Sequence, residues 1–245
     1  MSPSQLRLWV QEQRDNEALP FNGLTFLRLT GDLDREALER AFEALLERHE
    51  SLRTIFIQEE GEPRQKIVSP ETLGFNIVYH DFSNEADPEA RALETGLQER
   101  LKRFDFSAGP ILRVGLYRLS KDSYLLMMCS HHIITDEWSV QVQSKELIAL
   151  YNAYRRGEDS PLAPLSIQYK DYAAWLLSML SGEELERYRD YWLEQFSDQI
   201  PVLSLPSDRP RPEVPTFQGN EHYFTLSPEQ HNGCLLYTSP SPRDS

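Results

Sequence analysis

Apolar residues recur at helical spacing over residues 34–50, the most regular stretch of the chain. Glu and Arg occupy most positions between Leu38, Phe42, Leu45 and Leu46. This spacing places the apolar side chains on one face of a helix. Asp34 stands where such a helix needs an N-cap. The pattern therefore predicts an amphipathic helix that buries one face in a core.

A second pattern is the nearly unbroken apolar run of residues 123–130. Runs of this kind are typical of a central strand that is covered on both faces. Residues 111–119 are predicted as the neighbouring strand, joined to it by a tight polar turn.

The remaining elements follow from the same two periodicities. Strands are predicted over 23–30, 52–58, 65–68 and 75–79, and helices over 4–14, 88–103, 135 or 136 to 156, 168–180 and 183–196. Strands and helices mixed in this order favour a layered α/β domain.

The composition changes after residue 199. Five prolines fall between residues 200 and 215, so we expect an extended, semi-rigid linker there. A short strand-like segment, 222–226, follows. Ser227 then offers the start signals of a helix, but Asn232 and Gly233 are expected to prevent one from forming.

The last twelve residues, CLLYTSPSPRDS, resemble a translated adapter or cloning sequence. On that interpretation residues 232–245 are a non-native tail and are set aside in the fold prediction. A natural disordered tail is the alternative, given its Pro and Ser content.

Charge and cysteine content narrow the functional classes. The formal net charge is −14 with a pI near 4.9, which argues against binding to nucleic acid through its phosphates. The presence of only two cysteines argues against a disulfide framework or a zinc site. Residues 1–13 lack a signal-peptide core, and the apolar run 124–129 is too short to span a bilayer. We therefore expect a soluble, cytoplasmic protein that binds no membrane.

The segment HHIITDEWS, residues 131–139, lies where the buried strand gives way to a helix. Successive side chains on a strand point to opposite faces, so His131 and His132 should diverge, one inward and one toward a cleft. Asp136 falls at the helix N-terminus, where a carboxylate can cap backbone amides.

Three interpretations of this segment remain open on the residues alone. The histidines and Asp136 could bind a metal, although adjacent histidines converge poorly on one ion. They could be hydrogen-bonded structural residues. One histidine could also serve as a general base or positioning group, organised by Asp136.

The segment is similar to the HHxxxDG motif of nonribosomal peptide synthetase condensation domains, members of the chloramphenicol-acetyltransferase-like superfamily. Five further stretches resemble the same family in the same order over residues 2–230. They are SPSQLRLW (2–9), RHESLRTIF (48–56), FDFSAGPILR (104–113), YKDYAAW (169–175) and LPSDRPRP (205–212).

The resemblance implies one α/β lobe, a two-layer sandwich of mixed sheet and helices, of a normally two-lobed, V-shaped domain. Residues 1–199 would form the N-terminal lobe, 200–216 the linker, and 217–231 the start of a missing C-terminal lobe. Such domains form an amide between substrates tethered to the phosphopantetheine arms of donor and acceptor peptidyl carrier domains, next to an adenylation domain, and bind no cofactor directly.

Specific residues inherit expected roles from the resemblance. His132 corresponds to the catalytic histidine, as base or positioning group, and His131 supports the loop. Asp136 is expected to be buried and paired with Arg48 or Arg53. Ser139, with Trp138, should cap or pack the following helix. Glu137 stands where the family usually has glycine, which could serve a special backbone angle or leave room for substrate.

Other functions stay open. The chain could be a non-catalytic carrier-docking module, or a free-standing acyltransferase that uses a coenzyme A thioester. Ester formation and epimerisation are variants of the main hypothesis. Without a second lobe the cleft would be incomplete, so we expect little activity from this chain alone and exposed apolar surface.

Overall fold

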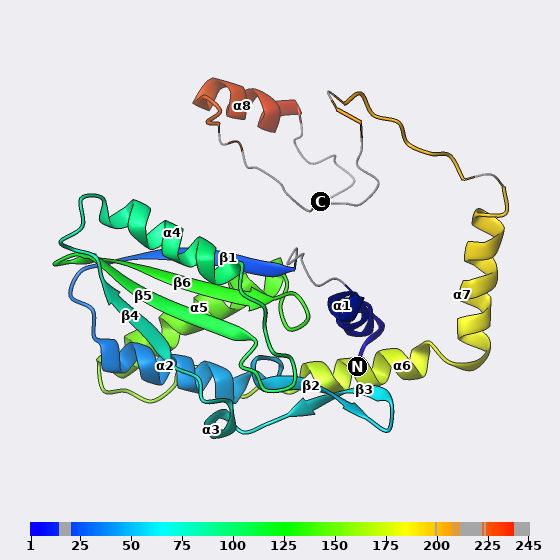
Figure 1. Cartoon of the computed structure of the whole chain (residues 1–245), viewed down its shortest axis with the longest axis horizontal. Helices are drawn as coiled ribbons and strands as arrows, with labels where there is room; N and C mark the ends of the chain where they lie inside the picture. Colours follow the sequence, from blue (N-terminus) through cyan, green and yellow to red (C-terminus); the bar gives the residue numbers. More distant parts are fainter. Residues whose placement is uncertain (15–20, 199, 208, 211–221, 223, 238–245) are drawn as a thin grey trace. The chain divides into compact units, whose positions relative to one another are not determined.

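The computed structural model describes residues 1–14, 21–198, 200–207, 209–210, 222 and 224–237. It divides into two compact units, Met1–Ser207 and Asp208–Ser245 (Figure 1). The candidate site lies in the first unit.

A four-stranded mixed sheet forms the centre of the first unit. Its strands, in spatial order, are β1 (Asn22–Thr30), β6 (Ser123–His131), β5 (Leu112–Ser120) and β4 (Ile77–Asp81). β4 runs parallel to β5, whereas the other two pairs are antiparallel. The prediction of a mixed sheet with helices packed on it is confirmed.

The apolar run of β6 is central because both of its faces are covered. Leu126 and Met128 face one core cluster, whereas Leu125, Met127 and Cys129 face another. Every residue from Leu125 to His131 is buried. The strand therefore delivers its last residue, His131, into protein interior.

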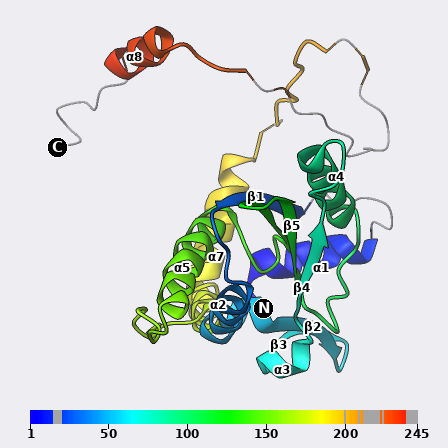
Figure 2. The ribbon, with the colours of Figure 1, turned by 90° about the vertical axis from the view of Figure 1, so that its left-hand side faces the viewer.

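Helices cover both faces of this sheet. α2 (Arg35–Arg48) and α5 (Glu137–Arg155) pack together on one face, and α4 (Pro88–Arg100) lies on the other (Figure 2). The four apolar residues that predicted α2 are all buried. α4 approaches β1 so closely that a Cβ at Gly96 would stand 2.4 Å from Phe26 Cζ, which explains the glycine.

Two further segments complete this part of the fold, one before β1 and one between α2 and β4. α1 (Pro3–Arg14) begins with reciprocal bonds in which Ser2 N donates to Gln5 Oε1 and Gln5 N donates to Ser2 Oγ. η1 (Glu50–Arg53) leads into a hairpin of β2 (Thr54–Glu59) and β3 (Glu62–Ile67), followed by the single turn α3 (Pro70–Leu73).

The helices α6 (Tyr169–Met179) and α7 (Gly182–Gln195) leave large apolar side chains in solvent. α7 has no buried residue. The side chains that are at least half exposed include Trp175 of α6, Tyr191, Trp192 and Leu193 of α7, and Phe196. The expectation of exposed apolar surface is confirmed for this segment.

One prediction for the second unit is wrong. α8 (Pro228–Tyr237) forms where Asn232 and Gly233 were expected to prevent a helix. Its start is capped as the sequence suggests, since Ser227 N donates to Gln230 Oε1 and Gln230 N donates to Ser227 Oγ. A glycine within a helix costs only about 1 kcal/mol relative to alanine, and that penalty does not end this one.

The strand-like segment 222–226 and the linker 200–216 lie partly outside the described residues. Residues 222, 224–226, 200–207 and 209–210 carry no helix or strand. Within the part of the chain that the structure describes, no helix combines the length and the apolar character needed to cross a membrane.

Candidate active site

The HHIITD segment forms a tight loop between β6, which ends at His131, and α5, which begins at Glu137. The two histidine rings diverge as the strand pattern predicts. His131 is 1% exposed, whereas His132 is exposed. Only the His132 ring can therefore meet a molecule from outside.

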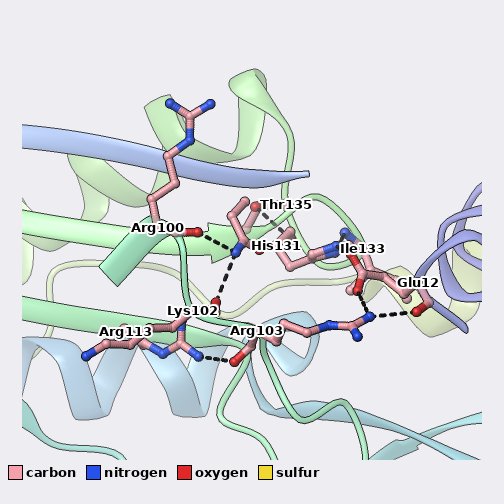
Figure 3. A network of polar contacts seen from close by, with 9 residues as sticks. Glu12, Arg100, Lys102, Arg103, Arg113, His131, Ile133 and Thr135 are labelled. Carbon is pink, nitrogen blue, oxygen red and sulfur yellow. Dashed lines mark hydrogen bonds and ion pairs between the residues drawn. The ribbon is translucent and has the colours of Figure 1, made fainter. Parts of the chain in front are cut away.

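The buried ring of His131 is fixed by hydrogen bonds at both nitrogens. Ile133 N donates to Nδ1 at 3.0 Å, so Nδ1 carries no proton. Nε2 then holds the proton and donates to Glu12 Oε1 at 3.2 Å (Figure 3). The rings of Phe21 and Phe106 approach edge-on, with centroids 6.0 and 4.8 Å from that of His131. Burial lowers the pKa of His131 to about 4, so the ring is neutral at physiological pH.

Glu12 belongs to a wider polar network beneath the loop. Arg103 Nη2 donates to the backbone oxygen of Glu12 at 2.7 Å and to its Oε2 at 3.0 Å. Arg113 donates to the carbonyls of Glu99 and Lys102. It also donates to the carbonyl of Arg103 (Figure 3). The Arg103 bonds tie α1 to the segment after α4, and the Arg113 bonds tie β5 to the end of α4 and to that segment.

Backbone and hydroxyl contacts hold the rest of the loop. Gln5 Nε2 donates to Ile133 O at 3.3 Å, and Thr135 Oγ1 donates to His131 O at the same distance. The hydroxyls of Ser130 and Thr135 lie 2.9 Å apart. The loop is thus fixed from α1 and from β6.

His132 is held at its backbone and at one ring nitrogen. Its N–H donates to Phe21 O at 2.9 Å, and Nδ1 lies 3.3 Å from Thr135 O. Because a carbonyl oxygen only accepts, Nδ1 carries the proton. In the neutral ring this leaves the lone pair on Nε2, which is the arrangement a proton acceptor needs.

Asp136 caps α5 and forms an ion pair with none of the arginines that the structure describes. Its Oδ1 accepts from the backbone N of Ser139 at 2.7 Å and from the Ser139 hydroxyl. The Ser139 hydroxyl bond, followed by the backbone bond, lowers the Asp136 pKa. The carboxylate is exposed, so it needs no buried cationic partner. The expectation of a buried Asp136–arginine pair is wrong.

Arg48 and Arg53 are engaged elsewhere. Arg48 Nε donates to Glu146 Oε1 of α5 at 3.1 Å, and His49 Nε2 lies 2.5 Å from Glu146 Oε2. Arg53 donates to Val68 O at 3.0 Å and lies 3.8 Å from Glu50. The hydrogen bonds of residues 48–56 (RHESLRTIF) thus connect α2, α5 and the β2–β3 hairpin.

The residues after Asp136 have simple environments. Glu137 is exposed and occupies the first turn of α5, where its charge suits the helix dipole. Its φ is not positive, so this position demands no glycine backbone. Ser139 takes part in the cap as expected. Trp138 is 75% exposed, so the expectation that it packs on the helix is wrong.

Sequence reasoning missed Glu12, Arg103 and Thr135. Glu12 follows Gln5 and Leu8 at helical spacing, and both of those are buried. A carboxylate on the apolar face of a helix was the available signal, because such a group needs a partner. Neither of the two cavities described, of about 120 and 280 Å³, is lined by the HHIITD loop.

The fold and this loop define an α/β lobe that presents one histidine at the end of a central strand. The family model for the condensation domain matches residues 1–237. The chain belongs to the condensation domain family.

Curated relatives agree with this assignment. The chain is 39% identical over 219 residues to malpibaldin synthetase of Mortierella alpina, a match that covers 89% of this chain and 4% of that protein. It is 36% identical over 233 residues to gramicidin S synthase 2 of Brevibacillus brevis, a match that covers 95% of this chain and 5% of that protein. The chain thus spans a small fraction of these relatives.

Solved structures share the fold. The starter condensation domain of rhizomide synthetase matches with a TM-score of 0.77 at 17% identity, over 86% of this chain and 48% of that one. The first condensation domain of the calcium-dependent antibiotic synthetase matches with a TM-score of 0.73 at 24% identity. That match covers 82% of this chain and 49% of the other. The chain covers about half of each, as expected for one lobe.

Proposed function

We propose that this chain is the N-terminal lobe of a condensation domain that forms amide bonds in nonribosomal peptide synthesis. The amine nitrogen of an acceptor attacks the thioester carbon of a donor. A C–N bond forms, the C–S bond breaks, and the thiol of the donor's phosphopantetheine arm is released with a proton. Donor and acceptor carrier domains would supply the substrates, loaded by an adjacent adenylation domain.

His132 is the residue that acts on the amine in this proposal. The supporting observation is its exposed ring, whose Nδ1–H is bonded to Thr135 O so that Nε2 holds the lone pair. As a general base it would contribute on the order of 10²–10⁴-fold to the rate. As a positioning group it would orient the amine toward the thioester. Because thioesters already react with amines, we infer positioning with partial base character.

The domain organisation is part of the proposal. Residues 1–199 would be the N-terminal lobe, 200–216 a linker, 217–231 the beginning of a second lobe, and 232–245 a non-native tail. The exposed apolar side chains of α6 and α7 support a missing covering layer. We expect the chain alone to be inactive or nearly so, because the cleft needs both lobes.

The decisive experiment joins this chain to a C-terminal lobe and supplies donor- and acceptor-loaded carriers. Mass spectrometry then measures amide on the acceptor carrier. We expect His132→Ala to abolish most product and His132→Gln to retain part of it, since the amide can still hydrogen-bond. His222→Ala, a change at an exposed histidine of the second unit, is the matched control.

Other outcomes select the alternatives. Carrier binding without product would indicate a docking module. Turnover with coenzyme A thioesters in the absence of carriers would indicate a free-standing acyltransferase. Product of equal yield from wild type and His132→Ala would remove His132 from the mechanism.

Glu137 is tested in the same assay. Its exposed carboxylate could narrow the acceptor channel or attract the acceptor ammonium. Glu137→Gly should raise turnover in the first case and lower it in the second. Unchanged turnover would show that the side chain only faces solvent.

A further inference from the structure

A buried carboxylate of α1 contacts the loop that carries His132, although the proposed chemistry assigns it no task. The side chain of Glu12 is 9% exposed. It lies between Arg103, 3.0 Å from Oε2, and the His131 ring, 3.2 Å from Oε1. Such a buried charge is retained only with partners that satisfy both oxygens.

Glu12 favours the same tautomer of His131 as the Ile133 N–H does. A carboxylate accepts only, so His131 must present an N–H to it at Nε2. The other nitrogen, Nδ1, is then free to accept from Ile133 N at 3.0 Å. The opposite tautomer would turn an N–H toward Ile133 N–H and a lone pair toward the carboxylate, which would lose both bonds.

The Ile133 bond shapes the turn on which His132 sits. It spans His131 to Ile133, and Ile134 N donates to His131 O at 3.1 Å around the same turn. His132 is the residue enclosed by these two bonds. A change of the His131 tautomer would break the first of these bonds in the turn that carries His132.

We propose that Glu12 is a positioning residue for His132 and acts through the tautomer of His131. The inference rests on the proposed role of His132 in amide formation. Glu12 does not touch the reacting atoms. Its contribution is to hold the loop in one geometry, and small misplacements of a reacting group reduce rates steeply.

The first test reads the tautomer directly. In the 245-residue chain, ¹H–¹⁵N correlation spectra of the imidazoles should show His131 protonated at Nε2. Glu12→Ala should produce a mixture of tautomers and shift the Ile133 amide signal. Glu12→Gln should preserve both signals, because its side-chain oxygen can still accept from Nε2–H. A Glu12→Ala chain with an unchanged tautomer would overturn the proposal.

The second test separates positioning from stability. In the complete condensation domain with loaded carriers, Glu12→Ala should lower kcat on the order of 10-fold or more at constant KM, with Glu12→Gln close to wild type. Arg103→Gln removes the ion pair but leaves the carboxylate on His131. It should therefore lower the melting temperature without the loss of kcat. Equal losses of kcat in Arg103→Gln and Glu12→Ala would mean a merely structural ion pair.

A surface control and the tautomer readout complete the design. Glu43→Gln changes an exposed carboxylate of α2 and should alter neither measurement. The tautomer spectra do not depend on amide formation. If His132→Ala retained full activity, the proposed role of His132 would fail while the Glu12–His131 relationship could still be measured.

Discussion

Arg48 Nε donates to Glu146 Oε1 at 3.1 Å, and both side chains are mostly buried, at 16% and 14% exposure. The pair joins α2 to α5 and also includes His49. Removing one member of a buried pair leaves an uncompensated charge. We expect Glu146→Ala to lower the free energy of unfolding by about 3 kcal/mol.

Urea unfolding of this chain measures that change. The control is Glu47→Ala, an exposed glutamate of α2, which should alter stability by less than about 0.5 kcal/mol. Equal effects of the two substitutions on the free energy of unfolding would contradict a structural role for the Arg48–Glu146 pair.

Asp136 should be far less important for folding than a buried ion pair. Because its carboxylate is an exposed N-cap on Ser139, Asp136→Ala should cost about 1 kcal/mol. Asp136→Asn keeps a side-chain acceptor and should stay near wild type. Soluble yield and urea midpoints measure both. An insoluble Asp136→Ala chain would contradict the exposed N-cap and favour a buried ion pair at this residue.

Stability should fall in mild acid because of His131. Its folded pKa is about 4, below the 6.5 of an unfolded histidine. Between these values the unfolded state binds a proton that the folded state does not. Stability from this group is therefore complete above pH 6.5 and decreases by about 3 kcal/mol as pH falls to 4.

The pH effect is isolated by comparison with His131→Gln. The difference in unfolding free energy between the two chains should be larger at pH 7 than at about pH 4.5, because only wild type carries the buried imidazole. Parallel stability curves across this range would mean that His131 does not titrate as its burial requires.

Cys129 should be unreactive in the folded chain. It is fully buried in β6, and burial raises the pKa of its thiol to about 11. Thiolate is the reactive form, so a thiol reagent at about pH 8 should label exposed Cys234 rapidly and Cys129 only after denaturation. A Cys234→Ser chain makes the measurement unambiguous, and fast labelling of it would argue against the packing of β6.

Local periodicity was sufficient to predict most of the first unit. The apolar positions of α2 follow one helical face, and all four are buried. The continuous run of β6 predicted a strand covered on both faces, which both core clusters confirm. In these elements the pattern is local, because burial repeats with the geometry of the element itself.

Partner choice was not predictable in the same way. Asp136 could have been matched to Arg48 or Arg53 by charge, but its exposure removes the need for a cation, and Glu146 lies on the adjoining helix instead. The Glu12–His131 contact joins residues far apart in the chain. Such pairings depend on how the finished layers meet, and one sequence does not encode them as a period.

Because β1 pairs with β6, it cannot form its sheet contacts until β6 has been synthesised. β1 has β6 as its sheet neighbour, which emerges roughly 100 residues later. At ~5–20 residues per second, β1 waits on the order of 5–20 s on the ribosome before it can pair. We expect α1 and β1 to be the segments most dependent on chaperones during synthesis, since β1 pairs with β6 and Ser2, just before α1, bonds with Tyr169 of α6.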